Sequence, residues 1–145
     1  MQRRTFFSSV TAGALGLVGL SRASAEETKR QKVVYHLADL DKVSFVLGNI
    51  QNHVEGTGGP GKADIRIVIH GPALRAFQSA SADARISTPV EKLSKAQVGF
   101  EACANTMRGL NITLADLLPG FVSAENGGVV RLAELQMQGY AYLRP

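Results

Sequence analysis

Cysteine, tryptophan and long apolar runs are scarce in this chain. Its 145 residues include one cysteine, Cys103, and no tryptophan. A single cysteine excludes an intramolecular disulfide, so no disulfide framework can hold the fold together. The weakly apolar stretch at residues 10–20 is interrupted by glycines and is too short to span a bilayer. The composition therefore predicts a domain that depends on the packing of its apolar core.

The first 25 residues have the composition of an export signal. Arg3 and Arg4 precede the weakly apolar run 10–20, and small residues follow at 23–25. This order of charged, apolar and cleavable segments is typical of a signal peptide. The arginine pair followed by Thr-Phe-Phe resembles the twin-arginine consensus. We expect residues 1–25 to be removed after Ala25, leaving a periplasmic protein without a membrane span.

Removal of this signal leaves residues 26–145 with nearly balanced charge. Three of the 16 basic residues leave with the signal, so 13 remain against 12 acidic residues. This balance removes the electrostatic argument for binding nucleic acid. The remaining 120 residues are close to the commonest size of one domain. We therefore expect a single domain over 26–145 and no nucleic-acid partner.

Strand and helix patterns alternate along this domain. Short runs rich in β-branched and aromatic residues predict strands at 32–37, 65–69, 98–102, 121–122 and 140–143. Apolar residues at helical spacing, with capping or proline signals, predict helices that begin near 43, at Pro72, at Pro89, at Asn105 and after a cap at Asn126. The alternation predicts an α/β fold, a three-layer α/β/α sandwich around a mostly parallel sheet of five strands.

Three reactive side chains fall at the carboxyl ends of the expected strands, namely His36, His70 and Cys103. Ligand sites in open parallel sheets gather at this edge, so we expect the three to approach one another. Cys103 also precedes a helical turn, where unpaired amides and the helix dipole lower the pKa of a thiol. A thiolate in this position can attack the sulfur of a persulfide or a disulfide.

Other interpretations use the same residues. Cys103 can instead pack beneath the turn as a small apolar side chain, and His36 and His70 can bond to backbone and hold the strand-end loops. Two imidazoles and a thiolate are also a soft ligand set for zinc or copper. Their scattered positions lack the short spacing of metal motifs, so we assign no metal and no cofactor.

A glycine-rich segment at 56–62 has the residue spacing of a phosphate-binding loop. Such a loop must follow a strand and open a helix, so that helix-terminal amides bind phosphate. This segment instead follows the helix that begins near 43 and precedes a strand. We interpret it as a connection between the two.

Four segments together resemble the DsrE/DsrF-like family. They cover nearly the whole mature chain in order and read VVYH at 33–36, VIHGP at 68–72, CANT at 103–106 and GYAYLRP at 139–145. The resemblance implies the three-layer α/β fold, assembly into trimers or hexamers, and a cysteine that receives and passes sulfur as a persulfide. By that pattern Cys103 matches the sulfur-carrying position, and Asn105 and Thr106 belong to the turn that follows it.

These observations lead to one functional hypothesis and one alternative. We expect a periplasmic sulfur-handling protein, a sulfur carrier or sulfurtransferase, in which Cys103 accepts sulfane sulfur. Asn105, Thr106 and backbone amides position it, and His36 or His70 tunes its protonation. The expected partners are further copies of the chain and a sulfur donor or acceptor protein. Because the best-understood relatives work in the cytoplasm, their substrates are not carried over. The alternative is a non-catalytic oligomeric binding module, with or without a metal, that uses the same strand edge.

Overall fold

The computed structural model describes residues 30–145. The expected signal peptide, residues 1–25, lies outside these described residues. Within the described part of the chain, no helix combines the length and the apolar character needed to cross a bilayer.

One five-stranded sheet, with strand order β4-β3-β2-β1-β5, forms the centre of the domain. Every neighbouring pair of strands is parallel. The strands are β1 (Lys32–Leu37), β2 (Asp64–Ile69), β3 (Gly99–Cys103), β4 (Phe121–Ala124) and β5 (Ala141–Leu143). The predicted α/β fold with a five-stranded parallel sheet is confirmed, and each strand lies within two residues of its expected bounds.

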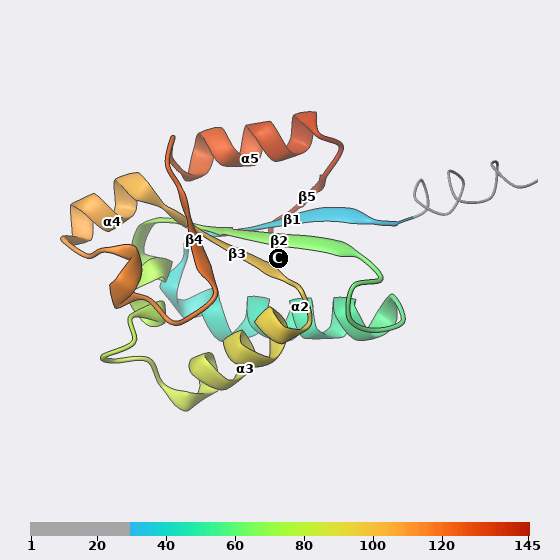
Figure 1. The fold of residues 1–145 in the computed structure, drawn as a ribbon, viewed down its shortest axis with the longest axis horizontal. Coiled ribbons are helices and arrows are strands. Elements are labelled where there is room, and N and C mark those ends of the chain that lie inside the picture. The colour runs from blue at the N-terminus through green and yellow to red at the C-terminus, as the bar shows by residue number, and fades with distance from the viewer. Residues whose placement is uncertain (1–29) are drawn as a thin grey trace, which may run out of the picture.

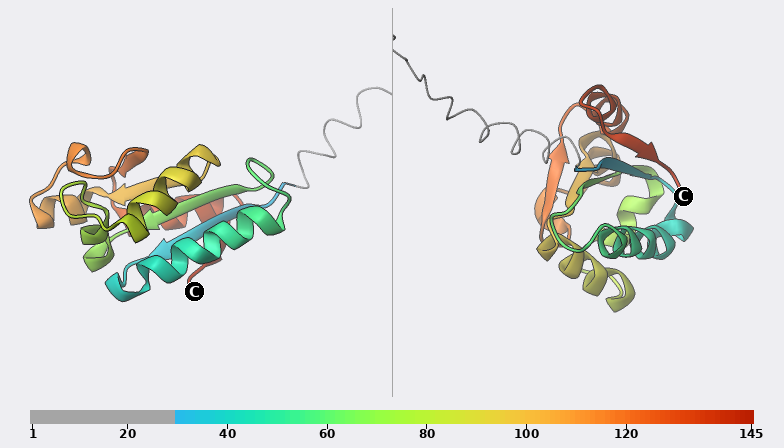
Figure 2. Two further views of the ribbon diagram at one scale, coloured as in Figure 1. Left: turned by 90° about the horizontal axis from the view of Figure 1, so that it is seen from below. Right: turned by 90° about the vertical axis from the view of Figure 1, so that its right-hand side faces the viewer.

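Helices cover both faces of the sheet (Figures 1 and 2). Two helices, α2 (Val43–Gly56) and α3 (Ala84–Lys95), lie side by side on one face. A single helix, α5 (Gly128–Met137), covers the opposite face, and α4 (Ala104–Leu110) lies beyond the carboxyl ends of the strands. Short 3-10 helices complete the connections: η1 (Leu40–Lys42), η2 (Gly71–Phe77) and η3 (Leu114–Asp116).

The two faces of the sheet differ in chemistry because successive strand residues point to opposite sides. In β2, Ile65, Ile67 and Ile69 belong to the large apolar core beneath α2 and α3. Between them, Val68 belongs to the small apolar cluster under α5. The other side chains that alternate with these isoleucines are polar or charged, and so is Glu101 in β3. The face under α5 therefore carries most of the polar groups of the sheet.

The connections from β3 and β4 run to different sides of the sheet. After β3, the chain returns through α4 and η3 on the side of η2, where the amide of Leu118 donates to the carbonyl of Phe77 at 2.9 Å. After β4, the chain crosses to the other face as α5 and ends in β5 beside β1. The carboxyl ends of β3 and β4 thus flank a topological switch point, where open α/β sheets place their ligand sites.

Helix α3 begins earlier than the sequence pattern predicts. Pro89 is expected to open a helix, but it lies inside α3, which starts at Ala84. The N-cap is Asp83, whose carboxylate accepts a hydrogen bond from the Arg85 amide at 2.7 Å. The missing amide hydrogen of Pro89 weakens the helix ladder. Burial of one apolar stripe maintains the helix around the proline, through Ile86, Val90 and Leu93.

The aromatic packing beneath β4 provides a test of the core. Phe77 is fully buried and its ring centroid lies 5.3 Å from that of Phe121. Phe77→Ala should lower the free energy of unfolding by about 3–5 kcal/mol through lost burial and an unfilled cavity. Phe45 is 60% exposed, so Phe45→Ala should change it by only about 0.5 kcal/mol. Urea unfolding of both variants checks this, and equal losses would contradict the assignment of Phe77 to the core.

Candidate functional site

Cys103 lines a cavity at the switch point. It is the last residue of β3 and the N-cap residue of α4, and its side chain is 5% exposed. The cavity has a volume of about 250 Å³ and is lined by His70, by Cys103, Asn105 and Thr106, and by residues 126–130. The thiol therefore combines a buried position with access through the cavity.

The sulfur of Cys103 accepts a hydrogen bond from the start of α5. The Gly128 amide, at the first residue of α5, donates to Sγ at 3.1 Å. Burial by itself raises the pKa of the Cys103 thiol, but hydrogen bonding from the Thr106 hydroxyl and from the amides of Gly128, Thr106 and Asn105 lowers it. The lowering prevails, so the pKa of this thiol lies below its ordinary value. The beginnings of α4 and α5 together stabilise a thiolate.

The Thr106 hydroxyl is oriented by a second contact. The Gly71 amide at the start of η2 donates to Thr106 Oγ1 at 2.9 Å. A hydroxyl can accept and donate at the same time, so this contact leaves its hydrogen available to the sulfur, and the Thr106 hydroxyl lowers the pKa of the thiol. Asn105 contributes differently, since its side-chain oxygen accepts from Arg108 while its backbone amide lowers the pKa of the thiol.

Two glycines allow α5 to approach the sulfur. Gly127, with φ of 96°, caps α5, whereas the sequence pattern predicts Asn126 as the cap. The helix entry needs a left-handed backbone conformation that glycine adopts readily, and Asn126 instead lines the cavity. At Gly128, a Cβ atom would lie 3.3 Å from the Cβ atoms of both Cys103 and His70. The sequence signal for this feature is the glycine pair between a strand and an apolar helix pattern.

His70 and His36 form a pair beside the cavity. Strand pairing ends with Ile69 opposite Ala102, so the next residues along β2 and β3, His70 and Cys103, are neighbours. Nε2 of His70 lies 2.6 Å from Nε2 of His36, and the rings stack with centroids 4.8 Å apart. Nδ1 of His36 lies 2.6 Å from the Tyr142 hydroxyl. The structure thus places His70 in the cavity and His36 behind it, in contact with β5.

Both histidines favour the neutral form. Burial lowers the pKa of His36 and of His70, and the positive charge of Arg144 acts in the same direction on each, whereas Asp39 opposes it. The proximity of His70 lowers the pKa of His36 further. At neutral pH the pair therefore supplies hydrogen-bonding nitrogens to the site and no fixed positive charge.

The described residues offer no ligand set for the metal-binding alternative. Across residues 30–145, no group of three or more histidine, cysteine, aspartate or glutamate side chains is placed to hold a metal ion. His36, His70 and Cys103 consequently do not form the three-ligand site that their residue types suggest.

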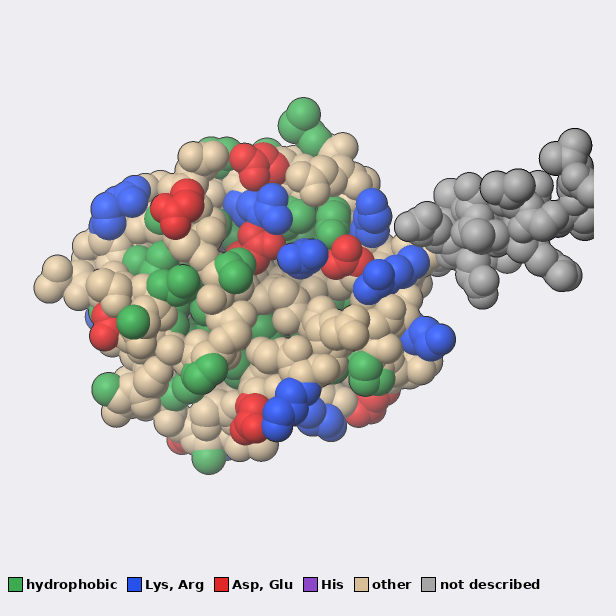
Figure 3. All heavy atoms as spheres, in the orientation of Figure 1, with side chains coloured by type: hydrophobic (Ala, Val, Ile, Leu, Met, Phe, Trp, Pro, Cys, Tyr) green, Lys and Arg blue, Asp and Glu red, His purple; other side chains and the backbone are tan. Residues whose placement is uncertain are grey.

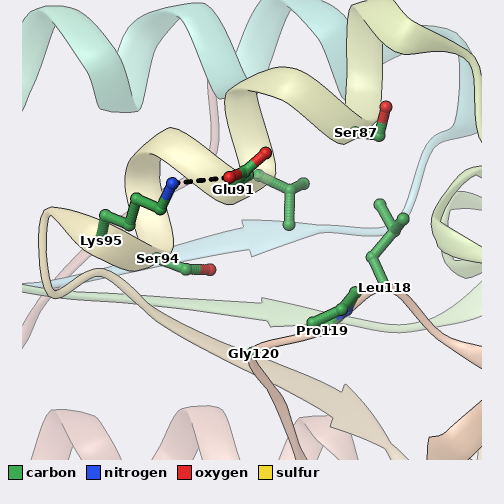
Figure 4. A pocket seen from close by; sticks show the side chains of 8 residues that line it. Ser87, Glu91, Ser94, Lys95, Leu118, Pro119 and Gly120 are labelled. Atoms are coloured by element: carbon green, nitrogen blue, oxygen red, sulfur yellow. Dashed lines mark hydrogen bonds and ion pairs between the residues drawn. The ribbon is translucent and has the colours of Figure 1, made fainter.

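A second cavity, of about 330 Å³, lies between α3 and residues 118–120 (Figure 4). It is mainly apolar, with the Glu91–Lys95 ion pair at its rim and the hydroxyl of Ser94 inside (Figure 4). Residues 118–120 precede β4, so this cavity lies at the amino ends of the strands, opposite Cys103. No cysteine or histidine lines it. The cavity at Cys103 is therefore the candidate site for chemistry.

The close approach of α5 to Cys103 predicts how a methyl group added at Gly128 changes the pKa of the thiol. Gly128→Ala should displace the start of α5 by a few tenths of an ångström, weaken the hydrogen bond to Sγ and raise the pKa of the thiol towards about 8.5. Gly48→Ala is the matched control, because Gly48 lies in α2 with open space around it. Titration of the thiolate absorbance measures both, and an unchanged pKa in Gly128→Ala would contradict the role of this contact.

The neutral histidine pair predicts how stability depends on pH. The pKa values of His36 and His70 are lower in the folded than in the unfolded state, so the unfolded state binds more protons as pH falls below about 6.5. The free energy of unfolding should therefore decrease from pH 6.5 downwards until the folded-state pKa values are passed. The double variant His36→Gln/His70→Gln should show a shallower decrease. Urea unfolding between pH 5 and 8 tests this, and identical slopes would refute it.

Comparisons with known proteins agree with the fold and its sequence pattern. A protein of unknown function, MTH1491 from Methanobacterium thermoautotrophicum, matches with a TM-score of 0.69 and 27% identity, covering 79% of this chain and 99% of that one. The ychN protein from E. coli matches with a TM-score of 0.57 and 17% identity, covering 79% and 99%. A search of the curated proteins finds no match.

The family comparison covers most of the chain. The model of the DsrE/DsrF-like family matches residues 23–145, which include every strand and helix described above. This confirms the resemblance seen in the four sequence segments. The protein belongs to the DsrE/DsrF-like family.

Proposed function

We propose that this protein is a sulfur carrier in which Cys103 accepts sulfane sulfur and passes it on as a persulfide. The observation that carries the proposal is the hydrogen bond from the Gly128 amide to Sγ, which favours a thiolate in a cavity that gives access to the sulfur. The thiolate is the nucleophilic form of cysteine, and a lowered pKa increases its fraction at neutral pH. Membership of the DsrE/DsrF-like family supports the same assignment.

The transfer step is an exchange between sulfur atoms. The Cys103 thiolate attacks the outer sulfur of a donor persulfide R–S–SH, forming a new S–S bond. The S–S bond of the donor breaks, and the donor leaves as the thiolate R–S⁻ while the proton stays on the transferred sulfur. An acceptor thiolate then repeats this exchange on the Cys103 persulfide. Atoms, charge and electrons balance at each step, so no other oxidant or reductant is needed.

The histidine pair has a place in this exchange. His70 lines the cavity, while His36 connects it to Tyr142 on the edge strand β5. A neutral imidazole can accept or donate a proton near pH 7. We assign His70, with His36 in contact with it, the role of accepting a hydrogen bond from the proton that stays on the transferred sulfur.

The location and assembly of the protein belong to the same proposal. The arginine pair and cleavable pattern of residues 1–25 support export to the periplasm in folded form. Assembly with further copies is supported by apolar side chains exposed on α5, with Val129 at 69% and Met137 at 89% exposed. A donor or acceptor protein would reach Cys103 through the cavity rim, which includes Val129 and Val130.

Intact mass spectrometry after incubation with polysulfide tests this function. Wild-type protein should gain mass in steps of one sulfur atom, and a reductant should remove the added mass. Cys103→Ser, which keeps a similar shape but lacks the nucleophilic sulfur, should gain nothing.

The control is a protein known to form persulfides, treated under identical conditions. If that control gains sulfur and the wild-type protein does not, the sulfur-carrier function is wrong, and the oligomeric binding module becomes the better interpretation of the site.

A further inference from the structure

Glu101 is the only charged side chain buried in the core of the described residues, at 3% exposure. It lies on β3 two residues before Cys103, so both side chains point to the face of the sheet under α5. A buried carboxylate is unfavourable unless it is paired and hydrogen-bonded. Neither the proposed chemistry nor the apolar core accounts for a carboxylate at this position.

The partner of Glu101 is Arg131, in the first turn of α5. The guanidinium makes two bonds to the carboxylate, with Nε to Oε2 at 2.5 Å and Nη2 to Oε1 at 3.1 Å. The Arg66 guanidinium lies 3.9 Å from Oε1 of the same carboxylate and also pairs with Asp64 at 3.1 Å. Figure 3 shows acidic and basic side chains close together on the side of the molecule just below α5.

Strand β3 and helix α5 therefore meet at two polar contacts. One joins Glu101 to Arg131, and the other joins the Cys103 sulfur to the Gly128 amide. Arg131 follows Gly128 by three residues, about one helical turn, and its own amide donates to the Gly127 carbonyl at 3.0 Å. The apolar cluster that holds the rest of α5 on the sheet is small and includes only Leu132 and Leu135 from this helix. The ion pair is thus the specific contact beside the turn that carries the Gly128 amide.

We propose that Glu101 and Arg131 are positioning residues that hold the Gly128 amide against the Cys103 sulfur. A two-point guanidinium–carboxylate contact fixes distance and orientation together, which a single contact or apolar packing does not. Ion pairs that contain a buried carboxylate add little net stability over apolar substitutes, so we expect the contribution of this pair to be geometric. The purpose of this positioning rests on the proposed sulfur-carrier function, whereas its effect on the thiol can be measured independently.

The test compares the thiol pKa of the wild-type protein with that of Glu101→Met/Arg131→Met. The double variant removes both charges, so it leaves neither an unpaired buried carboxylate nor a changed net charge near the sulfur. Its pKa should rise by about one unit, which lowers the thiolate fraction about tenfold at neutral pH. The more basic thiolate is also more nucleophilic, which partly offsets its lower abundance. The reaction rate with a small disulfide should therefore fall only about threefold. Circular dichroism establishes that the variant is folded.

The matched control is Arg85→Met, which removes an arginine from a surface ion pair with Asp83. The control should leave the thiol pKa and the reaction rate unchanged. His70 is the other titratable group lining the cavity, so each titration is repeated in His70→Gln to separate its contribution. If the double variant is folded and has the wild-type thiol pKa, the pair is a structural contact only and the inference is wrong.

A second variant keeps the inference testable if the double variant does not fold. Arg131→Lys retains the positive charge but lacks the planar fork. A raised thiol pKa in this variant supports positioning, while a wild-type pKa shows that charge alone suffices and overturns it. The outcome is distinct from that of the sulfur-transfer test: a thiol that responds to Arg131 but takes up no sulfur leaves the positioning intact and refutes the sulfur carrier.

Discussion

The hydrogen bond from the Gly128 amide to the Cys103 sulfur connects the two halves of the architecture. Strand β3 ends at the cysteine, and α5 begins at the glycine on the other side of the switch point. The chain can form this contact only because β4 is an edge strand whose connection crosses to the opposite face. The strand order, the glycine pair and the start of α4 therefore have a common consequence, which is a sulfur surrounded by hydrogen-bond donors.

The two faces of the sheet differ in polarity, which explains how a small domain can accommodate such a site. Most of the apolar core lies beneath α2 and α3, where alternate residues of the strands pack. The face under α5 has a much smaller apolar cluster and holds Glu101 paired with Arg131, and Asp64 bonded to Tyr140 at 2.6 Å. Stability comes largely from one face, so the other can carry polar groups arranged around the cysteine.

Much of this architecture could be predicted from local patterns. Runs such as residues 65–69 identify the strands, and the position of His70 and Cys103 after their strands predicts that they are neighbours. The start of α3 was less predictable, because the cap at Asp83 and apolar burial outweigh the proline signal at Pro89. The pairing of Glu101 with Arg131 was not predictable, since it joins residues 30 positions apart that only the crossover brings together.

The electrostatics of the site favour donors that do not titrate. Amides and a hydroxyl lower the pKa of Cys103, while the neighbouring histidines favour the neutral form. Backbone amides keep their hydrogens at every physiological pH, so the preference for thiolate persists while the histidine pair gains or loses a proton. In the proposed function, the charge of an ionised persulfide lies on the outer sulfur and not on Sγ. These donors therefore act mainly on the thiolate before transfer, and the proposed role of the histidine pair concerns the outer sulfur.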